Sequence, residues 1–383
     1  MEEESYFFRL SKYADALIAH NDANPTFIQP SSQRDFILKR LRDAPLHDLS
    51  ISRTTFNWGI PFPMDPRHVM YVWFDALTNY LTGVGWPDSE QSSHWPASVQ
   101  IIGKDIVWFH AVIWPAMLLS AGIPLPQQVF SHGFVNDEEG KKMSKTKGNV
   151  VDPHPTLSRY PVDSFRLYLV HNLTYGNDLP FSESNLVMVH NADLCDSLGN
   201  LVNRVANITS RYFNGVAPEA EHERIVDLAA LRRDTEQRLK ALDIGGAYAL
   251  AIQVTKDINN YLTTKEPWKI KDDPEDAKKA VIIRTVLEAI YINAHFLAPF
   301  LPETTARIFQ LLKTAPRALS SLSENEKHIV AGTLIGARFS FEKLPLPGQE
   351  VASSSEDDKK KKAAALAEAN KVRHRDTPLK LFA

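Results

Sequence analysis

The sequence predicts an α/β domain followed by an all-α helical bundle. Residues 71–80 and 101–115 each begin as a short apolar strand and continue as a helix, which is the repeating unit of an open parallel sheet. From about residue 182 onward the apolar spacing is almost wholly helical, which favours a bundle. We therefore place the α/β domain at residues 1–181, the bundle at 182–345, and a linker with a charged tail at 346–383.

Caps, helix breakers and alternation predict the other elements of the first domain. In chain order they are a helix at residues 6–21, a helix at 31–43, a strand at 49–53, the last sheet strand at 129–135, a turn at 137–140 and two short helices within 153–171. The first helix ends before Asn24-Pro25, and the second takes Ser31 or Ser32 as its cap.

The bundle is expected to contain five long helical segments. They lie near residues 183–213, 223–243, 246–264, 274–296 and 302–313. Pro345, Pro347 and Gly348 end the bundle, since these residues interrupt helices. The lysine run at 359–362 opens an Ala-rich tail, which we expect to be merely solvated rather than bound to phosphates.

A lysine-rich loop carries the strongest chemical signal. Residues 142–149 read Lys-Met-Ser-Lys-Thr-Lys-Gly-Asn, between Gly140 and Gly148. Lys142 and Lys145 can bring two ammonium groups to one triphosphate, where they offset the charge that develops as pyrophosphate leaves. The alternative is a solvated lysine-rich turn, and this segment alone does not decide between a mobile polyphosphate loop and such a turn.

Aromatic and aliphatic side chains form a stripe on each of the two predicted helices of the α/β domain. The first stripe contains Trp73, Leu77 and Tyr80, and the second contains Ile106, Phe109, His110 and Trp114. Ligands bind beyond the carboxyl ends of parallel strands, where both stripes are expected. The alternative for each stripe taken singly is ordinary helix core.

Taken together, these segments resemble methionyl-tRNA synthetases, a family of class I aminoacyl-tRNA synthetases. The lysine loop matches the class signature Lys-Met-Ser-Lys-Ser, with Thr146 at the last position. The stretches at 103–117 (Gly-Lys-Asp-Ile-x-x-Phe-His-x-x-x-Trp-Pro-Ala-Met) and 71–76 (Tyr-Val-Trp-x-Asp-Ala) narrow the resemblance to methionine. Leucyl- or valyl-type activation is disfavoured, because Trp73, His110 and Trp114 would crowd a branched side chain.

The resemblance implies a partial Rossmann-like catalytic domain with specific roles for its residues. Methionine would lie among Trp73, Leu77, Tyr80, Ile106, Phe109, His110 and Trp114. Apolar contact suits a thioether, which is a weak acceptor. ATP would be held through its ribose by Gly103 and Asp105, along its adenine by His132 and Val135, and at its phosphates by Lys142 and Lys145. Mg²⁺ would accompany the phosphates.

The family also carries a His-Ile-Gly-His signature in the first half of its nucleotide-binding fold. None of the thirteen histidines of this chain lies in a His-x-Gly-His context. Residues 1–13 resemble the closing stretch of the family's connective insertion. We therefore expect the carboxyl-terminal part of the enzyme, with an incomplete catalytic site and an amino-terminal half supplied by a longer gene product.

The resemblance implies a second site in the bundle. Asn207 and Arg211 are four residues apart on one helix face, and Trp268 follows Glu266-Pro267, which ends another helix. An indole beside an amide and a guanidinium can stack on an unpaired base and meet its edges. These residues match the family's readers of the CAU anticodon. The alternative is that Trp268 caps the core while Arg211 pairs with a surface acid.

Composition limits the remaining possibilities. The formal net charge of −3 gives no global attraction to nucleic acid, so tRNA contacts need local basic faces. The single cysteine, Cys195, excludes internal disulfides and a multi-cysteine zinc site, and we expect it to be buried on a helix. No apolar run suggests a membrane span. We expect a soluble protein of the mitochondrial matrix or cytoplasm.

Two functions stay open on these observations. The first is methionine–tRNA ligase, which activates methionine with ATP and transfers it to tRNA(Met). The alternative is a non-catalytic tRNA-binding module derived from a truncated synthetase. The first requires the amino-terminal half of the site and the second does not.

Overall fold

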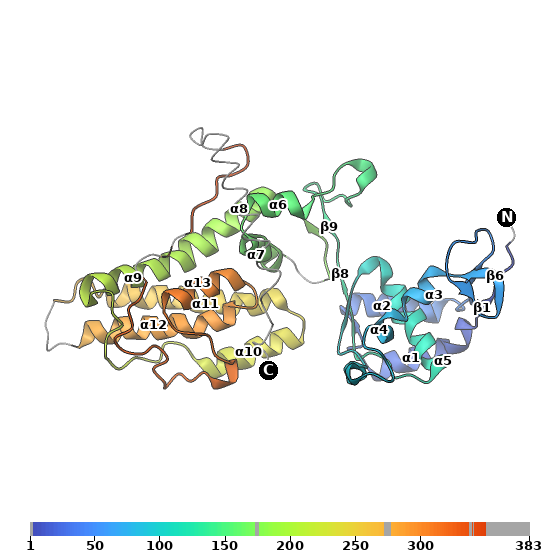
Figure 1. Ribbon diagram of the computed structural model, residues 1–383, viewed down its shortest axis with the longest axis horizontal. Coiled ribbons are helices and arrows are strands. Elements are labelled where there is room, and N and C mark those ends of the chain that lie inside the picture. Colours follow the sequence, from blue (N-terminus) through green and yellow to red (C-terminus); the bar gives the residue numbers. More distant parts are fainter. Residues whose placement is uncertain (1–2, 173–175, 272–276, 337–338, 340, 350–383) are drawn as a thin grey trace. The chain divides into compact units, whose positions relative to one another are not determined.

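The computed structural model describes residues 3–172, 176–271, 277–336, 339 and 341–349. The chain forms two compact units, residues 1–134 with 175–178 and residues 135–174 with 179–383 (Figure 1). The predicted domain boundary at 181/182 does not coincide with this division, because helix α7 (Val162–Asn172) packs against the bundle helices α8, α11 and α13. The tail at 350–383, with its lysine run, lies outside the described residues.

The first unit is built on a small parallel sheet. Its strands run in the order β2 (Ile28–Gln29), β8 (Val129–His132) and β7 (Gln100–Gly103), with Gly103 opposite His132. The longer helices of this unit are α1 (Ala14–Ala23), α2 (Ser31–Asp43) and α5 (Trp114–Ala121). Leu17, Ile37 and Leu118 are almost completely buried in the shared core. An α/β fold at the start of the chain is therefore confirmed.

Three details of the predicted elements are wrong. Residues 6–21 begin as strand β1 (Phe7–Phe8) and a 3-10 turn (Leu10–Tyr13) before α1 starts. Helix α2 has Pro30 as its N-cap and no capping side chain, so neither Ser31 nor Ser32 caps it. The last sheet strand stops at His132, and β9 (Val135–Asn136) instead pairs in parallel with β10 (Leu179–Pro180) in the second unit.

The segment before Trp73 belongs to an antiparallel sheet, not to the parallel one. The predicted strand at 49–53 splits into β3 (Leu49–Ser50), which pairs with β1, and β4 (Ser52–Arg53). Strand β6 (Asp65–Met70) lies between β4 and β5 (Pro61–Phe62). Of the two predicted strand-to-helix crossovers, only the one at β7 starts from the parallel sheet. The other leaves β6 and enters the short helices α3 (Val72–Ala76) and α4 (Asn79–Thr82).

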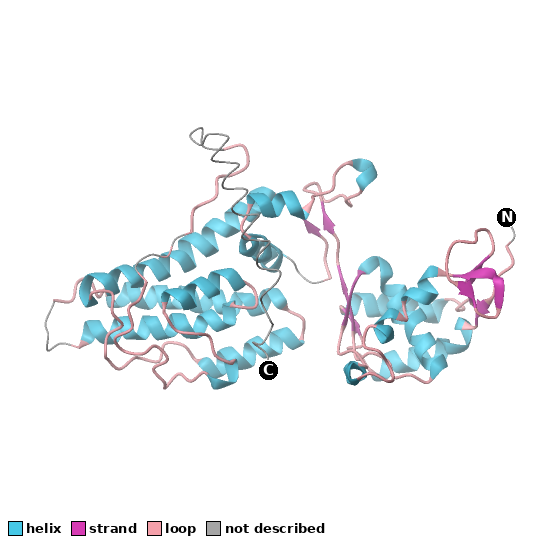
Figure 2. Ribbon diagram, viewed as in Figure 1, coloured by secondary structure: helices cyan, strands magenta, loops and turns pink. Residues whose placement is uncertain are grey.

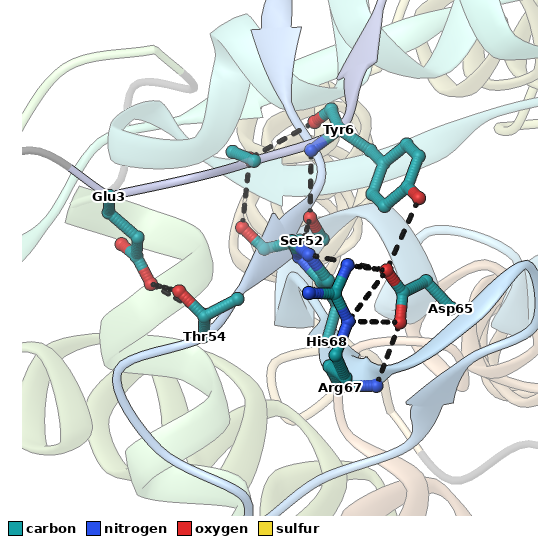
Figure 3. A network of polar contacts seen from close by, with 8 residues as sticks. Glu3, Tyr6, Ser52, Thr54, Asp65, Arg67 and His68 are labelled. Atoms are coloured by element: carbon teal, nitrogen blue, oxygen red, sulfur yellow. Dashed lines mark hydrogen bonds and ion pairs between the residues drawn. The ribbon is translucent and has the colours of Figure 1, made fainter.

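A polar network, buried at Ser52 and His68 and exposed at Arg67, holds this antiparallel sheet (Figure 3). The Ser52 hydroxyl accepts from the backbone N–H of Tyr6 at 2.9 Å and lies 3.0 Å from Nδ1 of His68. Asp65 accepts from the Arg67 guanidinium at 2.6 Å, and this contact lowers the pKa of the Asp65 carboxyl to about 2. Ser52 and His68 are almost fully buried, so the network serves to fix β6 and with it the direction of α3.

Apart from the short strands β9 and β10, the regular secondary structure in the described part of the second unit is helical, and loops connect its helices (Figure 2). A continuous helical run comprises α8 (Glu183–Val189), a π-helical stretch (His190–Gly199) and α9 (Asn200–Phe213). The next helices are α10 (Leu228–Lys240), α11 (Ile244–Lys265), α12 (Lys278–Leu297) and α13 (Pro302–Leu311). The five predicted segments are confirmed within the described residues, with α10 starting later than expected. The start of the fourth segment, residues 274–276, lies outside the described part of the chain. Before the bundle, α6 (Pro153–Arg159) and α7 confirm the two short helices.

Helix α12 is the centre of the bundle. Every residue from Ile282 to Leu297 is buried, and α9 and α11 pack against this helix (Figure 1). Its length and mean hydropathy of 1.4 would suffice for a membrane span, contrary to the expectation that no apolar run has that length. However, 89% of the apolar window is buried inside the protein, as is typical of a core helix.

Candidate functional site

Of the four residues predicted to hold the ribose and adenine of ATP, three meet at the carboxyl end of the parallel sheet. Strand β7 ends at Gly103 and β8 ends beside it at His132. The exposed Asp105 carboxylate lies across Gly103: a Cβ added there would come within 2.8 Å of Asp105 Oδ1 and 3.9 Å of His132 Cε1. Gly103 is therefore needed for this close approach. Val135, the fourth residue, lies in β9 of the second unit and is exposed.

The strand end is braced by a segment that sequence analysis did not identify. Both carboxylate oxygens of Asp178 contact Lys104 Nζ, at 2.7 and 2.8 Å. Asp178 also accepts from the backbone N–H of Phe134 at 2.9 Å. Gly133 admits the backbone of Asn177, which would collide with any side chain there. These contacts fix the turn after β8, and Lys104 is thereby paired within this unit.

Five of the seven predicted methionine residues form a connected wall in the first unit. Trp73 from α3 stacks on Phe109, with ring centroids 4.3 Å apart and an interplanar angle of 24°. Tyr80 from α4 lies with its hydroxyl 2.8 Å from Nε2 of His110. Nδ1 of His110 lies 3.0 Å from the Ile106 carbonyl. The structure thus brings together residues from two segments about thirty positions apart.

The remaining two residues, Leu77 and Trp114, are as deeply buried as His110, which is 2% exposed. Each is only 1% exposed, within the core of the first unit. The Trp114 ring lies between Tyr80 and Trp95, with centroids 6.2 and 5.9 Å away. These two residues therefore support the wall from the core, as the helix-core alternative would have them.

The protonation of the Tyr80–His110 pair follows from its neighbours. A carbonyl can only accept, so the proton of neutral His110 lies on Nδ1 and is donated to Ile106, while Nε2 accepts from the Tyr80 hydroxyl. Burial lowers the pKa of His110 and raises the pKa of Tyr80. The wall is therefore uncharged at neutral pH, which suits an apolar thioether.

The helix behind this wall is irregular where a regular α-helix was predicted. After a 3-10 turn (Lys104–Ile106), residues Phe109–Ile113 form a π-helix in which Trp114 N–H bonds to the Phe109 carbonyl. Pro115 follows at once and cannot donate a backbone hydrogen bond, which explains the local widening. The predicted i, i+3, i+4 and i+8 face is consequently displaced by the extra residue in the turn.

The lysine loop lies in the second unit and is cross-braced by Asp137 and Asn149. Asn149 Nδ2 donates to Asp137 Oδ2 at 2.7 Å and to the Lys142 carbonyl at 3.3 Å, and its Oδ1 accepts from Ser144 N–H at 2.9 Å. The hydrogen bond from Asn149 holds the pKa of Asp137 below its usual range. Between these anchors, Lys142 and Lys145 are exposed.

Met143 anchors the loop on its inner side. Its side chain packs against the small cluster that contains Tyr160, Tyr168 and Phe181. The Val151 N–H points at the Met143 sulfur, 3.4 Å away. A loop whose methionine is partly buried and whose lysines are exposed presents its positive charge to solvent in a defined conformation.

The three predicted anticodon residues are all accessible. Asn207 and Arg211 lie exposed on α9, and the Arg211 guanidinium lies 5.3 Å from the Tyr212 ring centroid. Trp268 follows the end of α11 and is 39% exposed, which argues against a core cap. Sequence analysis missed Arg204, which lies 5.6 Å from the Trp268 ring centroid. Its spacing to Asn207 and Arg211, i, i+3 and i+7, was a signal for it.

Two further expectations concern sulfur and metals. Cys195 is half-buried, with its sulfur 3.3 Å from Nε2 of His190, and burial raises the pKa of the thiol to about 11. A thiol with so high a pKa is a poor nucleophile at neutral pH. In the described part of the chain, no group of three or more His, Cys, Asp or Glu side chains is arranged to hold a metal ion.

Comparison with known proteins gives consistent matches along the chain. The family described as "tRNA synthetases class I (M)" matches residues 1–206, and "Anticodon binding domain of methionyl tRNA ligase" matches residues 214–343. The methionine–tRNA ligase of Mycobacterium leprae is 40% identical over 323 residues, covering 81% of this chain and 60% of the relative. The ligase of Thermotoga maritima is 37% identical over 353 residues, covering 90% of this chain and 56% of the relative. The chain thus spans little more than half the length of these relatives.

Solved structures give the same picture. The chain superposes on Mycobacterium tuberculosis methionyl-tRNA synthetase bound by methionyl-adenylate with a TM-score of 0.81 and 38% identity, covering 89% of this chain and 69% of that one. The free form of the same protein gives a TM-score of 0.80 at 35% identity, covering 90% of this chain and 70% of that one.

Proposed function

The chain belongs to the methionine-specific family of class I tRNA synthetases, and on that premise we propose that it takes part in the ATP-dependent ligation of methionine to tRNA(Met). The proposal rests on the neutral Tyr80–His110 pair and the Trp73–Phe109 stack. Together they form an apolar wall whose polar group is the hydrogen-bonded Tyr80–His110 pair. The relatives' names favour the ligase over a non-catalytic tRNA-binding module.

The reaction has two steps. A methionine carboxylate oxygen attacks the α-phosphorus of ATP and pyrophosphate leaves, which gives methionyl adenylate. A ribose hydroxyl of the terminal tRNA adenosine then attacks the methionyl carbonyl and AMP leaves. Neither step needs a nucleophilic side chain, so positioning and electrostatics supply the rate.

The proposed roles of the described residues follow from their chemistry. The Asp105 carboxylate beside Gly103 accepts hydrogen bonds from the ATP ribose, and His132 lies along the adenine. The exposed ammonium groups of Lys142 and Lys145 meet the phosphates and stabilise the departing pyrophosphate. Mg²⁺ would arrive with the phosphates, its usual partners, since the described residues offer no carboxylate cluster for it.

The bundle is proposed to read the CAU anticodon. Trp268 presents an accessible indole to a base, and Asn207 and Arg211 present an amide and a guanidinium on one face of α9. Stacking tolerates every base, whereas the polar groups discriminate among base edges. Because the formal net charge is −3, the whole chain does not attract RNA, and tRNA binding depends on such local features.

The test is methionine-dependent exchange of pyrophosphate into ATP. The 383-residue chain is assayed alone and after complementation with the His-Ile-Gly-His half of a family member, which we call the complemented enzyme. We expect exchange only in the complemented enzyme, because the chain contains no His-x-Gly-His motif. Absence of exchange in both, with CAU-specific RNA binding retained, would favour the tRNA-binding module.

A further inference from the structure

Arg204 connects two helices at the proposed anticodon site. It lies on α9, one turn before Asn207 and two turns before Arg211, so the three residues share one face of that helix. Its guanidinium donates to Oδ1 of Asn259 at 3.4 Å and to Oγ1 of Thr263 at 3.2 Å, both on α11. Arg204 therefore spans from the α9 face to the last turns of the helix that precedes Trp268.

The two acceptors on α11 are themselves held. Asn259 Nδ2 donates to the carbonyls of Ser197 and Thr255, at 3.2 and 3.3 Å, so the amide orientation is set by the protein. The Thr263 hydroxyl donates to the Asn259 carbonyl at 2.9 Å, which leaves its oxygen to accept from Arg204. The planar fork of the guanidinium is consequently fixed by two ordered oxygens.

Among the described residues 266–271 of its own segment, no side-chain hydrogen bond orients the Trp268 indole. Helix α11 ends at Lys265, Glu266 adopts a left-handed conformation with φ of 44°, and the indole is 39% exposed. The Arg204 guanidinium lies 5.6 Å from the ring centroid, within the range of a cation–π contact. If the indole becomes ordered only when the RNA binds, the conformational entropy lost by the side chain lowers the affinity for the RNA. A neighbouring residue that already orders the indole in the free protein removes this cost.

The length of the α9 face matches a short run of bases. Seven residues of α-helix separate Arg204 from Arg211, a rise of about 10 Å. Successive nucleotides of a stacked strand are about 3.4 Å apart, so this face can extend along about three of them. Trp268 stands at the Arg204 end of the face, and its free surface is available to the base at that end.

We infer that Arg204 is a positioning residue for Trp268, and that it holds the indole in the orientation that accepts an anticodon base. The inference rests on the proposed anticodon role of Trp268. Arg204 needs no contact with the RNA for this role, because it acts through the indole. The positive charge of Arg204 contributes to binding of any RNA. The orientation that Arg204 gives to the indole contributes only to binding of an anticodon loop with the CAU sequence.

The experiment measures binding of the 383-residue chain to a synthetic anticodon stem-loop RNA carrying CAU and to the same hairpin carrying AAA. Arg204→Ala is expected to weaken CAU binding by roughly 3- to 10-fold through lost preorganisation, with a smaller effect on AAA. Arg204→Lys keeps the charge but not the fork, and it should also lose discrimination between the hairpins. Arg233→Ala, at an exposed side chain on α10, removes the same charge and should leave discrimination unchanged.

A double variant separates positioning from general structural damage. If Arg204 acts through the indole, Arg204→Ala causes little further loss of discrimination between the hairpins once Trp268→Ala is present, whereas independent contributions to discrimination would multiply. Loss of discrimination in Trp268→Ala but not in Arg204→Ala would overturn the inference and leave the anticodon proposal standing. Unchanged discrimination in Trp268→Ala would overturn the anticodon proposal itself. Thermal unfolding of each variant fixes a temperature at which all are folded.

Discussion

Asn149 donates a 2.7 Å hydrogen bond to the carboxylate of Asp137, and this contact closes the base of the lysine loop. Asp137 is 8% exposed and also accepts from Lys141 N–H at 2.6 Å. The two exposed lysines of the Lys-x-x-Lys pair, Lys142 and Lys145, lie between these anchors. Asp137 and Asn149 therefore determine the conformation in which the loop presents its charge.

Asn149→Ala should loosen the loop without removing a charge. The change deletes three hydrogen bonds and leaves the nearly buried Asp137 without its amide partner, which typically costs about 1–3 kcal/mol. We expect trypsin to cleave the 383-residue chain faster at the loop lysines. In the complemented enzyme, kcat of exchange should fall while the KM for methionine is kept. Val150→Ala, at an exposed neighbour, is the matched control and should leave both rates unaltered.

Lys145→Ala should slow adenylate formation far more than it weakens methionine binding. The lysine ammonium interacts with phosphate charge that is largest in the transition state, so its removal should lower kcat and leave the KM for methionine nearly unchanged. A drop of roughly 100- to 1,000-fold is expected for one lost transition-state contact. Lys147→Ala removes an exposed lysine outside the Lys-x-x-Lys pair and should have a much smaller effect. A rise confined to the KM for methionine would remove Lys145 from its proposed role.

Tyr80→Phe should destabilise the fold but keep the preference for methionine over norleucine. The Tyr80 proton is committed to His110, so the substrate sulfur is recognised by shape and aromatic contact. Removing the hydroxyl leaves Nε2 of the buried His110 unpaired, at a cost of about 1–3 kcal/mol. Urea unfolding tests the first statement, and exchange kinetics of the complemented enzyme with both amino acids test the second. A collapse of the preference would mean that Tyr80 donates to the sulfur.

Local signals were sufficient for the bundle. Helices α8, α10 and α11 each start with a side chain that accepts from a backbone N–H of the first turn, namely Ser182, Asp227 and Asp243. Such caps, together with the 3.6-residue apolar period, are readable in sequence. The family and the fold class were also correctly predicted, because the motifs at 71–76, 103–117 and 142–149 are specific.

Features that depend on distant partners were not predictable. Phe7 is a strand residue because Ser50 pairs with it, and β6 is antiparallel because Ser52 faces Met70. No local sequence pattern predicts either strand pairing. The π-turn before Pro115 had a local cause that periodicity alone does not register. Asp178 and Arg204 act through contacts with residues far along the chain, so their importance emerges only from the folded structure.

The pH dependence of stability should be dominated at mildly acidic pH by buried His295. Burial lowers the pKa of its imidazole from 6.5 to about 4. Nδ1 lies 2.8 Å from the Tyr291 carbonyl, and Nε2 accepts from Arg317 N–H at 3.0 Å, so both nitrogens are satisfied only in the neutral form. Protonation of Nε2 would break the second bond and place a charge in the core.

The sign of the effect follows from which state binds the proton first. As the pH falls below 6.5, the unfolded chain takes up the proton while the folded chain does not. The stability contributed by neutral His295 is therefore complete above pH 6.5 and is lost as the pH falls towards 4. At pH 4.5 the loss should be roughly 2 to 3 kcal/mol. His110 and His190, whose pKa values are also lowered by burial, add to it in the same direction.

Urea unfolding of the chain and of His295→Gln at pH 7 and pH 4.5 isolates this contribution. Other titrating groups are common to both proteins, so the difference between their losses on acidification belongs to His295. We expect the unaltered chain to lose roughly 2 to 3 kcal/mol more than the variant, whatever their relative stability at pH 7. Equal losses would mean that the folded bundle tolerates a charged imidazole, and hence that the Arg317–His295 contact opens before the bundle unfolds.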